Sequence, residues 1–396
     1  MPARARPGPL AAAALATARE LARELAALDL SDLPDASLRG SSGAWLLFHE
    51  LGADAPAVPR ATVRRWEDAA RAALPALDAS FFDGMLGVAW LLARLGRAPD
   101  ELAAVDAAVL DVLHGAWDGG LAAFGGGLAG FGSYGLARLR ARAGRRIVAR
   151  CAALFGQLAH REGPLAWWSP GAAALPEAVR GQPPAPLLNR EGTAAAVAFL
   201  AAAGRVVPSA LPLARRGART LARELARPSP ALFGAAAPHA PPGLVHGAGT
   251  WALGGAGAVA ALLSVAAATA DLSAAARCGR MLADLDPELC GAADTSLASG
   301  TAGIACVLQA LAEATRQPVF AFAAEHWHRR TLRCRRPGVG IGGYLYGDAL
   351  APAGAGVRRP SPRPGLLEGA AGTALSLLCA ARGARASPWL ERCLLA

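Results

Sequence analysis

The sequence predicts an all-α protein built from seven helical hairpins, and two observations support this prediction. A Gly-x-x-Gly pair opens an apolar, helix-periodic segment in six places, and a seventh segment keeps only the first glycine. Convincing strand patterns are almost absent. Such repeats decide the architecture, so they are considered before any single motif. The first glycines of the seven segments are Gly40, Gly84, Gly127, Gly192, Gly254, Gly300 and Gly369.

The spacing of these glycines indicates two helices per repeat. Successive first glycines are separated by 44, 43, 65, 62, 46 and 69 residues. Helices average about 11–12 residues and connections are short, so each step holds two helices, with longer insertions in three of them. Glycines three apart share one face of a helix, which lets a neighbouring backbone come close. In the fourth repeat, Ala195 takes the place of the second glycine.

Residues 1–36 are predicted to form a leading helix that ends near Pro34. The start is basic and alanine-rich, as in a signal peptide, but Leu21, Leu25 and Leu28 keep the spacing of an amphipathic helix. Repeats and outer amphipathic helices then alternate along the chain. Three segments rich in Pro and Gly are predicted as loop excursions on one face, with a short hairpin expected at 340–344 in the last. These excursions are 163–190, 228–248 and 335–365.

The segment from Gly249 to Ala270 contains no charged residue over 22 positions, which is long enough to cross a bilayer. Its many glycines and alanines favour a different interpretation, a helix buried on all sides within the protein. We therefore expect no transmembrane span.

Composition favours a single globular domain of 396 residues with 54% hydrophobic and 18% charged residues. The net charge is +10, and every basic residue is an arginine. The arginines are scattered and lack a known nucleic-acid motif, so nucleic acid is not an expected partner. The densest cluster, Arg329 to Arg336 with His326 and His328, is either a solvated helix face or a site for an acidic peptide.

Seven cysteines are widely spaced and form no Cys-x-x-Cys pair. This pattern argues against a disulfide framework and against a zinc finger. We expect free thiols in a reducing compartment, and hence a cytoplasmic location.

The repeats resemble the lanthionine cyclase family (LanC-like, lanthionine synthetase C) over nearly the whole chain. The resemblance rests on the set of glycine pairs, the opening SLRGSSGAWLLFHELG and the closing GLLEGAAGTALSLL. It implies an α/α toroid, in which GxxG-led helices form an inner ring within an outer ring of helices. It also implies a precursor peptide as partner, expected to carry an acidic leader, and a lanthipeptide dehydratase as a second partner. In the family, cysteine thiols of the peptide add to dehydroalanine or dehydrobutyrine to give thioether rings.

The family's zinc ligands are a Cys from a WCxG motif and a Cys-His pair from a CHG motif. Zinc with an open coordination position binds the substrate sulfur as thiolate, the nucleophilic form. In this sequence Ala252 follows Trp251, and Ala298 and Ser299 precede Gly300. Alanine cannot bind zinc and serine is a poor ligand, so we expect no metal site and no zinc cofactor here.

Other residues at the expected ring entrance remain candidates for a substrate pocket. Glu191, beside Arg190, stands where the family has a histidine. A replacement metal site from His246 and Cys290 is a further hypothesis, although lone His and Cys residues are more often structural. Asp83, Glu191 and Glu368 are either carboxylates at helix N-termini or a glycosidase acid and base pair. The pocket candidates are Arg190, Glu191, His246, Trp251, Ser299 and Glu368.

Three functional hypotheses follow. The first is a zinc-independent cyclase that promotes thioether formation by holding the peptide, with Arg190 or His246 stabilising charge. The second is a non-catalytic peptide-binding or scaffold partner of a dehydratase or active cyclase. The third is a carbohydrate-active α/α toroid. Metal content and consumption of peptide thiols discriminate between them.

Overall fold

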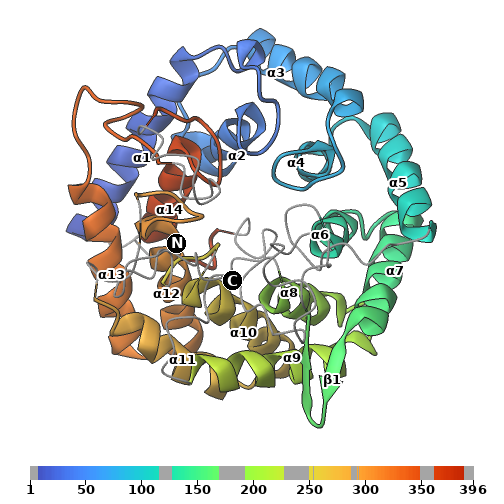
Figure 1. Ribbon diagram of the computed structural model, residues 1–396. Coiled ribbons are helices and arrows are strands. Elements are labelled where there is room, and N and C mark those ends of the chain that lie inside the picture. The colour runs from blue at the N-terminus through green and yellow to red at the C-terminus, as the bar shows by residue number, and fades with distance from the viewer. Residues whose placement is uncertain are drawn as a thin grey trace, which may run out of the picture.

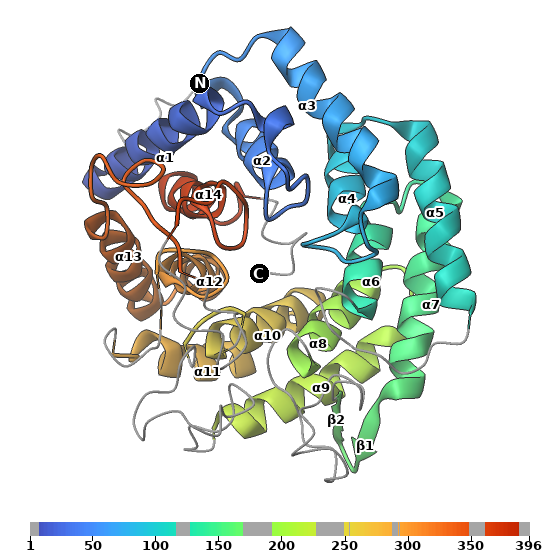
Figure 2. The ribbon, with the colours of Figure 1, turned by 45° about the horizontal axis from the view of Figure 1, so that its top comes forward.

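The computed structural model describes residues 8–115, 127–168, 192–226, 249–252, 254–286, 292, 294–347 and 361–387. Within these residues the chain alternates between an outer and an inner ring of helices, as Figure 1 shows. Each repeat contributes an outer helix followed by an inner one. Figure 2 shows the same two concentric rings from a tilted direction. The predicted all-α fold, an α/α toroid of seven helical hairpins, is confirmed.

The seven inner helices all begin directly after the first glycine of a repeat. They are short and almost entirely buried; in the fourth, ten of the eleven residues are buried. Their bounds are α2 (Ser41–Leu51), α4 (Met85–Leu95), α6 (Leu128–Ala137), α8 (Thr193–Ala203), α10 (Gly255–Thr269), α12 (Thr301–Thr315) and α14 (Ala370–Arg382).

The seven outer helices present one apolar stripe to the inner ring and a polar face outwards. In α9, for example, exposed arginines alternate with buried alanine and leucine residues at helical spacing. The bounds are α1 (Pro9–Ala27), α3 (Arg60–Ala73), α5 (Pro99–His114), α7 (Arg142–Leu158), α9 (Ala210–Leu225), α11 (Ser273–Ala283) and α13 (Pro318–Arg333). Short 3₁₀ turns follow α1, α2 and α3 at Leu30–Asp32, Gly52–Asp54 and Leu74–Ala76.

The second glycine of five pairs, at positions 43, 87, 257, 303 and 372, allows a close backbone contact within its own repeat. A Cβ atom added at Gly372 would lie 1.8 Å from the carbonyl oxygen of Leu366, six residues earlier. At Gly303 the corresponding distance to the oxygen of Leu297 is 2.0 Å. The approaching backbone is therefore the segment that leads into the inner helix. Only a residue without a side chain permits this contact.

The ring closes between the last repeat and the first two helices. Helix α14 packs against both α1 and α2. Arg382, in the last turn of α14, donates hydrogen bonds to the carbonyl oxygens of Glu50 (2.8 Å) and Leu51 (2.9 Å). It also forms an ion pair with Asp54 at 2.5 Å. These contacts cap the end of α2 with a guanidinium group from the other end of the chain.

Two predicted boundaries were wrong. The leading helix ends at Ala27 rather than near Pro34, because Leu28 is extended (φ −82°, ψ 131°) and Asp29 instead begins the 3₁₀ turn by accepting from Ser31 N. The predicted excursion at 163–190 begins inside a hairpin of β1 (His160–Glu162) and β2 (Leu165–Trp167). Residues 169–190, the excursion at 228–248 and residues 348–360 lie outside the described residues. The hairpin expected at 340–344 is present as an antiparallel bridge between Ile341 and Tyr344.

Helix α10 lies in the inner ring, as expected for the uncharged segment that contains it. No helix in the described part of the chain is long and apolar enough to span a bilayer. The cysteines among the described residues are free, and four of them are buried: Cys151, Cys278, Cys306 and Cys379. Cys290 and Cys393 lie outside those residues.

The arginine cluster on α13 is only partly a solvated face. His328 faces inwards and is 1% exposed, so it does not belong to the cluster. Arg335 is tied to the carbonyl oxygen of Gly342 (2.8 Å) and to Glu20 of α1. Arg329 pairs with Glu325 one turn earlier on the exposed face.

Candidate functional site

The N-terminal ends of the inner helices meet at one end of the ring, where main-chain hydrogen bonds join neighbouring repeats. The residues involved stand one to three positions before the first glycines. Arg39 N donates to Phe82 O (3.3 Å), Leu366 N to Leu38 O (2.8 Å), and Ala298 N to Leu367 O (2.9 Å). Ala252 N donates to Ala298 O at 2.8 Å. This set of bonds, which we name the rim, links repeats 2, 1, 7, 6 and 5.

The rim brings together Ala252, Ala298 and Ser299, the three residues that the resemblance leads us to expect in place of zinc ligands. The main-chain bond between Ala252 and Ala298 holds these two residues side by side, with Ser299 next to them. Both alanines are 0% exposed and Ser299 is 1% exposed. The Ser299 hydroxyl contacts the Ser296 hydroxyl at 3.2 Å. Two methyl groups and one hydroxyl group thus share this place.

Trp251, a pocket candidate, belongs to the packed centre of the ring. It is 2% exposed and meets Phe82 of the second repeat edge to face, with ring centroids 6.1 Å apart. Its carbonyl oxygen lies against Gly257, where an added Cβ would be 2.2 Å away. This geometry makes Trp251 a core residue that closes the centre below the rim.

Four charged side chains form a cluster across the closure of the ring, which we name the rim cluster: Arg39, Asp83, Arg363 and Glu368. Glu368 is 4% exposed, and one of its oxygens accepts from Arg39 (3.0 Å) and from Arg363 (2.9 Å). Arg39 also pairs with Asp83 at 2.5 Å. A cavity of about 370 Å³ lies against this cluster, between Pro34, Asp35 and Pro364.

The geometry of the rim cluster argues against the glycosidase hypothesis, which needs two carboxylates that act as general acid and base. Asp83 and Glu368 do share one site, but Arg39 stands between them and pairs with both. A general acid has to hold a proton at a sugar oxygen, and two guanidinium groups instead stabilise Glu368 as a carboxylate. The arrangement suits a structural role, in which Glu368 holds Arg39 and Arg363 in place.

Asp-x-Ser turns that lead into three of the inner helices were missed by sequence reasoning. Asp294 accepts from Ser296 N (2.8 Å) and from Gly347 N (3.0 Å), and burial raises its pKa. Its own carbonyl oxygen accepts from Thr301 N, the first residue of α12 (3.0 Å). The same Asp-x-Ser turn precedes α2 at Asp35 and α4 at Asp78. The repeated signal, DAS, DAS and DTS five or six residues before a first glycine, was available in the sequence.

The remaining candidates are not placed by the structure. Arg190, Glu191, His246 and Cys290 lie outside the described residues. Among the described residues, no group of three His, Cys, Asp or Glu side chains is arranged to hold a metal ion.

Comparisons with known proteins agree with this architecture. No protein-family model matches the chain, and no curated protein sequence matches it. A solved structure of nisin cyclase matches with a TM-score of 0.66 and 15% sequence identity. The match covers 92% of this chain and 93% of the nisin cyclase chain. This protein is therefore an α/α toroid that shares its fold, over nearly its full length, with nisin cyclase.

Proposed function

We propose that the protein is a LanC-like component of lanthipeptide-type peptide maturation that binds a dehydrated precursor peptide at the rim without zinc. The fold shared with nisin cyclase supports the substrate class. The observation that carries the proposal is the adjacency of Ala252, Ala298 and Ser299, joined through a 2.8 Å main-chain bond. These residues stand where the resemblance leads us to expect zinc ligands, and none of them binds zinc strongly.

The residues at these positions do not fit a zinc ion. A structural or catalytic zinc site needs three or four thiolate, imidazole or carboxylate ligands, and these positions offer none. The methyl groups of Ala252 and Ala298 are also sealed from solvent. Ala252, Ala298 and Ser299 supply neither a metal ligand nor a cation, which are the groups that lower a thiol pKa and favour the thiolate. We therefore favour a peptide-binding protein that does not itself activate thiols.

The second candidate is a zinc-independent cyclase. Holding a thiol near an alkene accelerates addition by proximity alone. Arg39 and Arg363 border the 370 Å³ cavity and are only about one quarter exposed. Both arginines already pair with carboxylates, so the specific observation for this candidate is the cavity itself, which could hold a thiol and an alkene together.

One experiment separates the two candidates. The purified protein is incubated with a dehydrated precursor peptide, and residual free thiols are counted over time beside a sample without protein. Binding of the same peptide is measured in parallel. Binding with thiol loss at the control rate supports the peptide-binding proposal, and faster loss supports the cyclase. Absence of binding, or zinc bound at one ion per chain, contradicts the proposal.

A further inference from the structure

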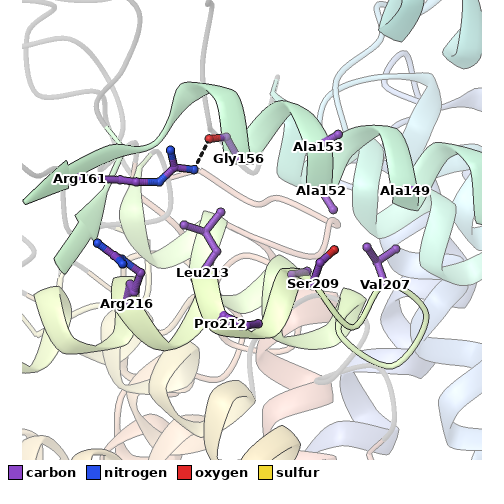
Figure 3. A pocket seen from close by; sticks show the side chains of 11 residues that line it. Ala149, Ala152, Ala153, Gly156, Arg161, Val207, Ser209, Pro212, Leu213 and Arg216 are labelled. Atoms are coloured by element: carbon purple, nitrogen blue, oxygen red, sulfur yellow. Dashed lines mark hydrogen bonds between the residues drawn. The ribbon is translucent and has the colours of Figure 1, made fainter. Parts of the chain in front are cut away.

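A groove separates the outer helices α7 and α9 on the outside of the ring, away from the rim. It encloses about 520 Å³. One wall is the small-residue stripe Ala149, Ala152, Ala153 and Gly156 of α7, and the other carries Leu213 of α9. In Figure 3 the two helices run along opposite sides of this space, with Ser209 and Val207 at one end. The floor and walls are apolar, and the volume accommodates more than one aliphatic side chain.

Two arginines stand at the other end of the groove. Figure 3 shows Arg161 of the hairpin and Arg216 of α9 at the same end of this space, with the Arg161 guanidinium turned towards Gly156. Arg161 donates to the carbonyl oxygen of Gly156 at 2.5 Å, and Arg216 donates to that of Gly163. The Nε of Arg216 is buried and has no hydrogen-bond partner among the described residues. A carboxylate placed at this end would meet two guanidinium groups, one with an unused donor.

Both helices that form the groove are strongly basic. Helix α7 contains four arginines and no acidic residue, and α9 contains four arginines and one acid. That acid, Glu224, is 3% exposed and pairs with its neighbour Arg223. The groove is therefore an apolar slot between two basic helices with Arg161 and Arg216 at one end, which complements a partner that carries both acidic and aliphatic groups.

We propose that this groove binds an acidic peptide segment with aliphatic side chains, the carboxylates pairing with Arg161 and Arg216 and the aliphatic groups filling the slot. A peptide fits better than a membrane surface. Membrane-binding helices present large apolar side chains outwards, whereas the large exposed apolar side chains among the described residues lie on other elements. On α7 the exposed apolar positions in the groove are Ala149 and Ala153.

This inference rests on the proposed function, since the segment would be an unmodified, acidic part of the same precursor peptide. The groove would hold that segment outside the ring while the modified part lies at the rim. Its test uses neither dehydrated residues nor thiols, so its failure and the failure of the proposed function are distinguishable.

The probe is a fluorescent synthetic peptide in which Glu and Leu alternate, and fluorescence anisotropy measures its binding to the full-length protein. We expect saturable binding that weakens with added salt. Ala153→Glu places a negative charge, the same sign as the probe's, at an exposed position in the slot. Arg161→Gln removes one cation. Each substitution should weaken binding about ten-fold or more, since a ten-fold change needs only about 1.4 kcal/mol.

The matched control is Ala321→Glu, an exposed alanine on the outer helix α13 at another part of the ring. This variant adds the same charge to the protein and should bind the probe as the unsubstituted protein does. Equal weakening by Ala321→Glu and Ala153→Glu would show that net charge alone attracts the probe, and would overturn the proposal. Binding of a Gln-Leu peptide as tightly as the probe would also overturn the proposal. So would a protein that does not bind the probe but binds anionic phosphatidylserine vesicles in a way that Ala153→Glu weakens.

Discussion

Ala252, Ala298 and Ser299 lie next to each other as the residues of a site would, but their side chains lack the chemistry of a metal site. Their backbones are held next to each other by hydrogen bonds that no side chain enters. Their side chains are buried and carry no group that binds zinc strongly. Ligands introduced at these three positions would therefore stand on adjacent stretches of backbone.

The triple substitution Ala252→Cys, Ala298→Cys and Ser299→His tests this consequence. We expect the variant to bind about one zinc ion per chain, as three such ligands with an open fourth position do. The unsubstituted protein is expected to bind no stoichiometric zinc. Metal analysis after exhaustive dialysis gives both values. A variant that folds and binds no zinc would mean that these backbones do not present ligands to a common point.

His328 makes stability depend on pH. Burial lowers its pKa from 6.5 to about 4, so the folded protein holds it neutral while the unfolded chain takes up a proton below pH 6.5. Stability is therefore unaffected above pH 6.5 and falls as pH decreases towards 4. Between pH 7 and pH 5 the loss should be about 2 kcal/mol, given about 1.4 kcal/mol per pH unit. Urea denaturation at pH 7 and pH 5 should show that His328→Leu lacks this fall in the free energy of unfolding. If the variant kept the same pH dependence, His328 would not be its source.

At the scale of single elements, the inner helices depend on how closely the preceding segment can approach them. Gly372→Ala would place a Cβ 1.8 Å from Leu366 O, inside contact distance with main-chain atoms that cannot turn aside. We expect a loss of about 3 kcal/mol, at the upper end of typical overpacking costs. Gly156→Ala on α7 is the control, because no atom lies within 4 Å of the added methyl. It should stabilise the protein by about 0.5–1 kcal/mol, and urea midpoints measure both.

The sequence predicted those elements that depend on local pattern. The first glycines marked the start of every inner helix, and the second glycines at 43, 87, 257, 303 and 372 each meet backbone only five or six residues away. The end of α1 was misjudged because Leu28 continues the apolar spacing although its backbone is extended. The rim cluster was not predicted as a unit, since Arg39 and Glu368 are 329 residues apart and nothing local relates them. Buried His328 was assigned to the arginine cluster because it lies between His326 and Arg329 in the sequence.

At the scale of the whole molecule, closure of the ring joins the first and last repeats through Arg39 and Glu368 as well as through Arg382. Glu368→Gln would leave two arginines beside an uncharged, buried amide. We expect the free energy of unfolding to fall by about 3 kcal/mol, the lower end of the cost of breaking a buried pair, since both arginines keep some contact with water.

Glu325→Gln provides the comparison, because the Glu325–Arg329 pair lies on the exposed face of α13 with side chains 45% and 47% exposed. Its loss should change the free energy of unfolding by less than about 0.5 kcal/mol. Guanidinium denaturation curves of the two variants measure both losses in the free energy of unfolding, which can then be compared. Similar effects from both substitutions would contradict a structural role for the closure.

The main-chain bonds of the rim also bear on how such a protein diverges. Since they use only N–H and C=O groups, almost any amino acid except proline can occupy the linked donor positions without weakening them. Mutation can therefore erase one chemistry at these positions and install another while the surrounding architecture stays intact. The rim therefore suits protein engineering, because side chains can be exchanged there while the main-chain bonds keep the positions next to one another.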